Sequence, residues 1–218
     1  MAILDGGVNG GFRGKAGSVV GYYMYGKWII RGLPKLSRKN KKGSVKQNLA
    51  RAKFTAMQHF LGPVLYFIRV GFNLASKEHN NSAYNSAKSY NMLNAMNADG
   101  TIQYAQVCLT YGTLTGVEGA VVEKDDAGIH FSWANNTNSY GSRKTNDASA
   151  SDQVMLVAYD VQGKQATFTT SGARRDVGKE SLLLHKSDKG KEFHLWISFI
   201  ADHRDCIATS TYLGSLVY

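Results

Sequence analysis

From Thr101 to the C-terminus, several short stretches have apolar side chains at every second position, and this alternation limits the possible folds more than any other feature of the sequence. A period of two is typical of β-strands that bury one face. Turn signals such as Gln162-Gly163-Lys164 and Lys189-Gly190-Lys191 separate the alternating stretches. The alternating positions are Val107, Leu109 and Tyr111; Ile129, Phe131 and Trp133; Val154, Leu156 and Ala158; and Phe193, Leu195, Ile197 and Phe199. A final strand is expected to contain Tyr212, Leu213, Leu216 and Val217.

The number of these strands favours a sandwich of two antiparallel sheets over residues 101–218. Roughly seven short strands in about 115 residues is the count expected of an immunoglobulin or fibronectin type III domain. Trp133 resembles the buried tryptophan of fibronectin-like modules, and we expect it to be a core aromatic residue. The chain is therefore predicted to be α+β and mainly β, with an immunoglobulin-like antiparallel β-sandwich as its C-terminal region.

Residues 35–100 are predicted to form a basic loop followed by two or three helices. Ser44-Val45-Lys46-Gln47 has the form of a capping box, so we expect the first helix to begin there. Gly62-Pro63 interrupts it and places a proline as the first residue of a second helix, and a third is expected from Ser82 to Met96. The apolar faces expected are Leu49, Ala52, Ala56 and Phe60 in the first helix and Leu65, Ile68 and Phe72 in the second.

Residues 1–34 combine frequent glycine with aromatic and β-branched side chains, which favours a Gly-rich β-hairpin arm. The expected strands are Ser18 to Tyr25 and Trp28 to Leu33, joined by a two-residue turn at Gly26-Lys27. A two-stranded hairpin is marginally stable in water, so the arm needs either the body of its own chain or another chain to pair with. The residues expected to contact such a partner are Tyr22, Tyr23, Tyr25 and Trp28.

The net charge of +10 comes from one segment. Residues 1–53 hold twelve lysines and arginines against one acid, Asp5, whereas the remainder holds fourteen basic and fifteen acidic side chains. The dense part of this segment is either a solvated surface or a site for nucleic acid or another polyanion, bound without regard to sequence. The residues that would form such a site are Lys35, Arg38, Lys39, Lys41, Lys42, Lys46, Arg51 and Lys53.

Several stretches resemble a known family. They are GGFRGKAGSVVGYYMYGKWIIRGLPK, NLARAKFTAMQHFLGPVLYFIRVGF, AYNSAKSYNMLNA and the closing YLGSLVY. Together they are similar, over nearly the whole chain, to an uncharacterised family of Bacteroidota catalogued as domain of unknown function 6266. The resemblance implies a bacterial or phage origin and supplies no catalytic residue.

No motif of the sequence predicts an enzyme, a metal site or a cofactor. The six histidines include no His-x-x-x-His or His-Glu-x-x-His pair, and the glycines form no phosphate-binding loop. Cys108 and Cys206 are too far apart for a redox or zinc motif and are expected to be reduced. A small hydrolase would need a pocket that gathers His130, His194 or paired acids such as Asp125-Asp126.

Three hypotheses follow for the function. The first is a non-enzymatic structural or assembly protein whose arm pairs with another protein or with like subunits. The second is polyanion binding through residues 35–53, and the third is the hydrolase. The N-terminus has no signal-peptide pattern, and the longest apolar stretch, Val64 to Ile68, is far shorter than a membrane span of about 20 residues. We therefore expect a location in the cytoplasm or within a phage particle.

Overall fold

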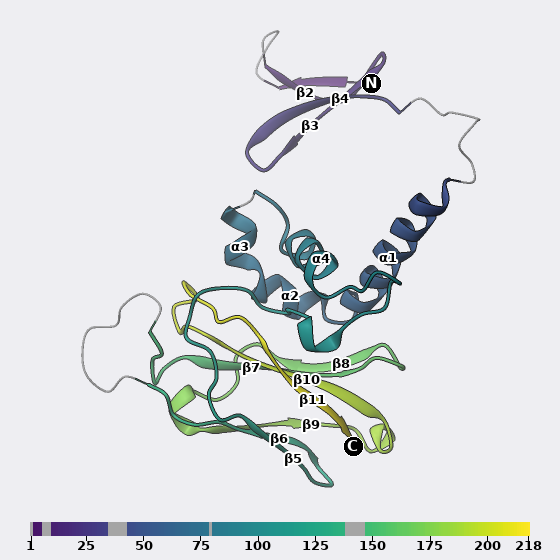
Figure 1. The fold of residues 1–218 in the computed structure, drawn as a ribbon. Helices are drawn as coiled ribbons and strands as arrows, with labels where there is room; N and C mark the ends of the chain where they lie inside the picture. Colours follow the sequence, from purple (N-terminus) through teal and green to yellow (C-terminus); the bar gives the residue numbers. More distant parts are fainter. Residues whose placement is uncertain (1, 6–9, 35–42, 79, 138–146) are drawn as a thin grey trace. The chain divides into compact units, whose positions relative to one another are not determined.

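A computed structural model describes residues 2–5, 10–34, 43–78, 80–137 and 147–218 of the chain. The chain divides into two compact units, Met1–Gln47 and Asn48–Tyr218. The first contains a small sheet, and the second contains most of the helical region together with the sandwich (Figure 1). The two units are described separately below.

The first unit is a four-stranded antiparallel sheet in the order β1-β2-β3-β4. Its strands are β1 (Ala2–Asp5), β2 (Gly11–Ala16), β3 (Val19–Met24) and β4 (Lys27–Gly32). The predicted hairpin is thus present as β3 and β4, and two further strands of the same chain extend it.

The turn of this hairpin lies one residue earlier than predicted. Met24 pairs with Lys27, so the two turn residues are Tyr25 and Gly26 and not Gly26 and Lys27. Both have positive φ, 51° and 76°, which is the requirement of a type I′ turn. This turn matches the right-handed twist of the flanking strands, which offsets the cost of placing a tyrosine in the left-handed region.

The second unit begins with four helices. They are α1 (Val45–Leu61, of which the first residues precede the boundary), α2 (Leu65–Gly71), α3 (Asn73–Glu78) and α4 (Ala83–Asn94). The predicted capping box is confirmed, because the Gln47 amide donates to Ser44 Oγ at 3.3 Å and the Ser44 amide donates to Gln47 Oε1 at 3.0 Å. Helix α2 begins two residues after Pro63, and α3 was not predicted.

The predicted apolar face of α1 is buried only at its C-terminal end. Phe60 is buried together with Met57 and Leu61, whereas Leu49 is 44% exposed and Ala52 is also exposed. The prediction for the first half of this face was wrong, since the buried positions of α1 are confined to its last turns.

The sandwich consists of seven antiparallel strands in two sheets, ordered β11-β10-β7-β8 and β5-β6-β9. They are β5 (Val121–Lys124), β6 (Gly128–Ser132), β7 (Gln153–Asp160), β8 (Gln165–Thr169), β9 (Lys179–Leu183), β10 (Glu192–Ile200) and β11 (Thr211–Val217). The fourth strand of the sandwich, β8, pairs with the third, β7, as the additional strand does in variable-type immunoglobulin domains. The strand number and the pairing agree with the predicted immunoglobulin-like fold.

The segment containing Val107, Leu109 and Tyr111 was predicted as a strand and is an irregular connection. Side chains form hydrogen bonds with backbone amide and carbonyl groups of this segment that would otherwise pair with a neighbouring strand. Asn91 Oδ1 accepts from the Cys108 amide and Asn91 Nδ2 donates to the Cys108 carbonyl, both at 2.8 Å. The Leu109 amide donates to Ser210 Oγ at 2.9 Å. The alternation here therefore reflects burial without strand pairing.

The sheet that contains β7 and β10 is buried on both faces, which makes three layers. Val154, Leu156 and Ala158 of β7 pack toward the β5-β6-β9 sheet, whereas Met155, Val157 and Tyr159 pack toward the helices. Figure 1 shows α1, α2 and α4 covering the outer face of this sheet. The helices and the β5-β6-β9 sheet therefore pack on opposite faces of the same sheet, with one hydrophobic cluster on each face.

Trp133 is a core residue, as predicted. Its indole nitrogen donates to the Arg175 carbonyl at 2.8 Å, and its ring makes an edge contact with Phe199, with centroids 5.5 Å apart. The Arg175 side chain is fully buried beside Asp152, with 3.3 Å between Nε and Oδ2. The guanidinium also donates to the carbonyl oxygens of Thr115 and Gly116 and to Asn136 Oδ1.

Candidate interaction surfaces

The N-terminal sheet exposes most of its apolar side chains. Among the described residues of this unit, no hydrophobic side chain is buried. The large hydrophobic side chains of the sheet that are exposed are Ile3, Leu4, Tyr23, Met24, Tyr25, Trp28 and Ile30. A sheet is ordinarily stable when one face packs on a core, so this sheet offers apolar surface to a partner.

Two of the four predicted partner-binding residues come together on this sheet. Tyr23 and Trp28 are a cross-strand pair whose rings meet edge to face, with centroids 5.0 Å apart. The Arg13 guanidinium lies 5.7 Å from the Trp28 ring centroid. The indole lies so close to the backbone of Gly11 that a Cβ there would be 1.8 Å from the ring. We call Arg13, Tyr23 and Trp28 the aromatic patch.

The other two predicted residues lie elsewhere. Tyr22 pairs with Ile29, and both point to the face opposite Tyr23 because side chains alternate along a strand. Tyr25 is in the turn, where it is exposed. The predicted set is therefore divided between the two faces and one end of the sheet.

One edge of this sheet is formed by β4, which pairs only with β3 among the described strands, and β1 forms the other edge. Five of the six residues of β4 are exposed, including Ile30 at 60%. An edge strand presents unpaired amide and carbonyl groups to another strand. Lys27 and Arg31 place two positive charges along this edge.

The predicted polyanion site is only partly within the described residues. Lys35, Arg38, Lys39, Lys41 and Lys42 lie outside them. Lys46 and Arg51 are exposed on α1, and Lys53 is half-buried on the same helix. The helix contains no acidic residue, and Glu78 is the one acid in the sequence between residues 43 and 98. The helical layer is therefore basic well beyond the predicted segment.

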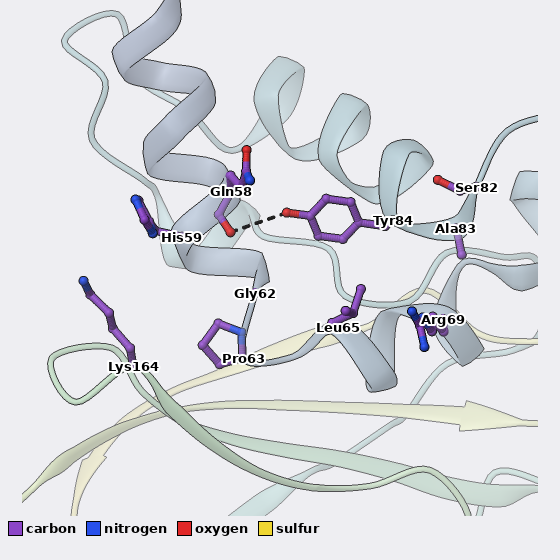
Figure 2. Close-up of a pocket in the computed structure, with 10 residues that line it drawn as sticks. All are labelled: Gln58, His59, Gly62, Pro63, Leu65, Arg69, Ser82, Ala83, Tyr84 and Lys164. Carbon is purple, nitrogen blue, oxygen red and sulfur yellow. Dashed lines mark hydrogen bonds between the residues drawn. The ribbon is translucent and has the colours of Figure 1, made fainter. Parts of the chain in front are cut away.

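A groove of about 700 Å³ lies where α1, α2, α4 and the β7–β8 turn meet, and we call it the basic groove (Figure 2). Its size is within the range of ligand sites. It is lined by Gln58, His59, Gly62, Pro63, Leu65, Arg69, Ser82, Ala83, Tyr84 and Lys164. No carboxylate is among these residues.

Sequence reasoning missed this groove because its residues are far apart in the chain. His59 was one of six unassigned histidines, and Lys164 was noted only as part of a turn. The structure places Lys164 at φ 52°, in the left-handed region of the turn that follows β7.

The wall of the groove is backed by another cation, Lys88. Its ammonium lies 3.3 Å from Gln58 Oε1 and 3.5 Å from the centroid of Phe54. The Tyr84 ring centroid is 5.3 Å away. Burial lowers the pKa of Lys88. The Lys88 ammonium thus contacts aromatic rings and an amide oxygen. None of these groups carries a negative charge, so they do not neutralise the positive charge of Lys88.

His130 makes the contacts that most resemble a catalytic arrangement. Its Nδ1 lies 2.7 Å from Ser181 Oγ, and its Nε2 lies 2.7 Å from Asp125 Oδ2. The Ala127 amide and then His130 lower the pKa of Asp125. His130 and Ser181 are opposite each other on β6 and β9. The cavity that Asp125 lines includes neither of them.

A hydrolase needs its nucleophile to face a cavity that holds the substrate. The contact of His130 with Ser181 is a cross-strand contact between β6 and β9, and Asp125 lies in the turn between β5 and β6. His194 is also hydrogen bonded, with Nδ1 2.7 Å from the Tyr212 hydroxyl, and burial lowers its pKa. The described part of the chain contains no cluster of three His, Cys, Asp or Glu residues suited to a metal ion. Within the same residues, no helix is long and apolar enough to span a membrane.

Comparison of the chain with known protein families shows the family to which it belongs. One family profile matches residues 11–214, which include most of both units. The chain belongs to DUF6266, a family of unknown function. The resemblance noted in the sequence is thereby confirmed. No curated protein and no solved structure matches this DUF6266 chain.

Proposed function

We propose that this DUF6266 chain is a non-enzymatic assembly protein that binds a partner by adding a strand to the β4 edge of its N-terminal sheet. The observation that carries the proposal is a sheet whose described apolar side chains are all at least partly exposed. The family resemblance favours a bacterium or a phage as the setting.

The chemistry of the edge favours one kind of partner. Backbone groups of β4 would supply the hydrogen bonds of an added strand, while Ile30, Tyr23 and Trp28 would supply apolar contacts. Lys27 and Arg31 alternate with Trp28 and Ile30 along β4 and point to the opposite face. A second copy would bring the same positive charges to the edge, so an extended segment with acidic side chains is the better complement.

A pair of synthetic peptides tests this proposal. One alternates valine with glutamate over eight residues, and the other alternates valine with lysine. We expect the Val-Glu peptide to bind and the Val-Lys peptide to fail, as followed by Trp28 fluorescence or by NMR of β4. The double variant Lys27→Glu/Arg31→Glu should reverse this preference, because both side chains are exposed and their replacement leaves the sheet intact.

Two results would count against the proposal. One is equal binding, or no binding, of both peptides by the wild-type chain. The other is a dimer in light scattering that disappears when residues 1–34 are removed, which would assign the edge to a second copy.

A second candidate function, polyanion binding, is favoured by the cations of α1. Lys46, Arg51 and Lys53 lie on a helix without acids. Three phosphate contacts to a single strand should give a slope of roughly −2 in a plot of log affinity against log salt. Replacing all three residues with glutamine should remove that slope in a titration with oligothymidylate. Binding that is insensitive to salt would exclude this function.

A further inference from the structure

The strongest unassigned feature of the molecule is the basic groove. Three cationic or hydrogen-donating side chains from three elements line it: His59 from α1, Arg69 from α2 and Lys164 from the β7–β8 turn. Figure 2 shows His59 and Lys164 at one end and Arg69 at the other, with Pro63 and Leu65 between them. The groove therefore has two basic ends and an apolar middle.

This arrangement defines the charge pattern of a ligand. Each end can hold one anionic group, and the absence of carboxylates from the lining removes competition for the cations. The middle of the groove is formed by Pro63, Leu65 and the ring of Tyr84 and is uncharged. The Tyr84 ring is held in place because its hydroxyl donates to the Gln58 carbonyl at 3.4 Å. A ligand with two anionic groups around an uncharged, flat body is the best complement.

Phosphate suits the two ends better than carboxylate. The guanidinium presents five N–H donors and the ammonium three, and a phosphate group offers more acceptor oxygens than a carboxylate does. The ammonium of Lys88 behind Gln58 and Tyr84 adds further positive potential. Two phosphates joined by an uncharged unit are the repeat of a nucleic acid strand, in which a sugar lies between the 5′ and 3′ phosphates and carries a flat base at its side.

We propose that the basic groove binds one nucleotide unit of a single strand, with its two phosphates at Arg69 and at His59 and Lys164 and with the nucleoside over Pro63, Leu65 and Tyr84. The proposal rests on the second candidate function and names its site.

The test compares three small probes by calorimetry: thymidine 3′,5′-bisphosphate, thymidine 5′-monophosphate and pyrophosphate. We expect the bisphosphate to bind about tenfold more tightly than either of the others, since it alone carries two separate phosphate groups with a nucleoside between them. Arg69→Gln should reduce its affinity to that of the monophosphate, and Lys164→Gln should also weaken it by about tenfold. Lys179→Gln, an exposed charge on β9, is the matched control and should have no effect.

Each alternative result has a definite meaning. Equal affinity for bisphosphate and pyrophosphate, or equal loss in Lys179→Gln, would overturn the proposed groove site. Oligothymidylate binding that depends on Arg51 and Lys53 but not on Arg69 and Lys164 would also overturn it, while leaving polyanion binding intact. Binding of neither oligothymidylate nor bisphosphate would reject both.

Discussion

Replacing Asp152 with alanine should strongly destabilise the second unit, because it leaves the Arg175 guanidinium buried without its carboxylate. Both side chains are 0% exposed, and Nε and Oδ2 are 3.3 Å apart. Asp152 Oδ2 also accepts from the Ser149 amide at 2.8 Å. The substitution therefore removes an ion pair and a hydrogen bond in a region that water does not reach.

The expected loss is about 3–5 kcal/mol, the usual cost of removing one partner of a buried ion pair. Other contacts still stabilise the positive charge of Arg175 in the variant. The guanidinium donates to the carbonyl oxygens of Thr115 and Gly116 and to Asn136 Oδ1, and it lies 3.7 Å from the Phe199 ring centroid. For a unit of this size, the same loss lowers the Tm by about 6–20 °C. Replacing both partners, as Asp152→Leu/Arg175→Met, should recover much of the stability.

Chemical denaturation followed by tryptophan fluorescence measures this effect, because Trp133 and Trp196 are both buried in the second unit. Asp202→Ala removes an exposed carboxylate from a turn and should change the unfolding free energy by less than about 0.5 kcal/mol. If Asp152→Ala is no more destabilised than Asp202→Ala, the reasoning about the buried pair is refuted.

Three further outcomes are expected. Burial raises the pKa of the Cys108 thiol to about 11, so it should resist alkylation at pH 8 in the folded protein and react only after unfolding; labelling of the native chain at Cys108 would contradict this. The hydrogen bond from Lys191 is the main cause that lowers the pKa of Asp188. The stabilisation of the fold by this carboxylate is therefore present above about pH 4 and is lost as the pH falls through the lowered value. Asp188→Asn should show a smaller fall in Tm between pH 6 and pH 2 than the wild-type protein does. Gly71→Ala should cost about 1–3 kcal/mol in a urea titration, because a Cβ would lie 2.5 Å from the Leu109 carbonyl oxygen, and a neutral result would show that this packing relaxes freely.

The sequence predicts the architecture well wherever the period of apolar residues matches the structure. The capping box at Ser44 and Gln47 is formed as expected, and the strand from Ile129 to Phe131 is present as part of β6. The third layer was not anticipated, although β7 carries a signal for it. Met155, Val157 and Tyr159 are apolar as well as Val154, Leu156 and Ala158, and a strand that is apolar on both faces is covered on both.

The errors have physical causes in particular residues. A glycine can occupy either position of a tight turn, so the pattern around Gly26 did not reveal that Tyr25 also has positive φ. Alternation at residues 107–111 predicts a strand, but the side chains of Asn91 and Ser210 satisfy the backbone instead. The basic groove requires His59, Arg69 and Lys164 to meet in space, and no local pattern in the sequence carries that information.

Hydrogen exchange at the β4 amides tests the proposal of strand addition most directly. The measurement compares amide exchange of residues 27–32 in the full chain, with and without a saturating amount of the Val-Glu peptide. A strand added at this edge hydrogen bonds to the outward-facing amides, so we predict slower exchange at alternate positions of β4 and no change in β10. Unchanged exchange along β4 while the peptide is bound would contradict the account.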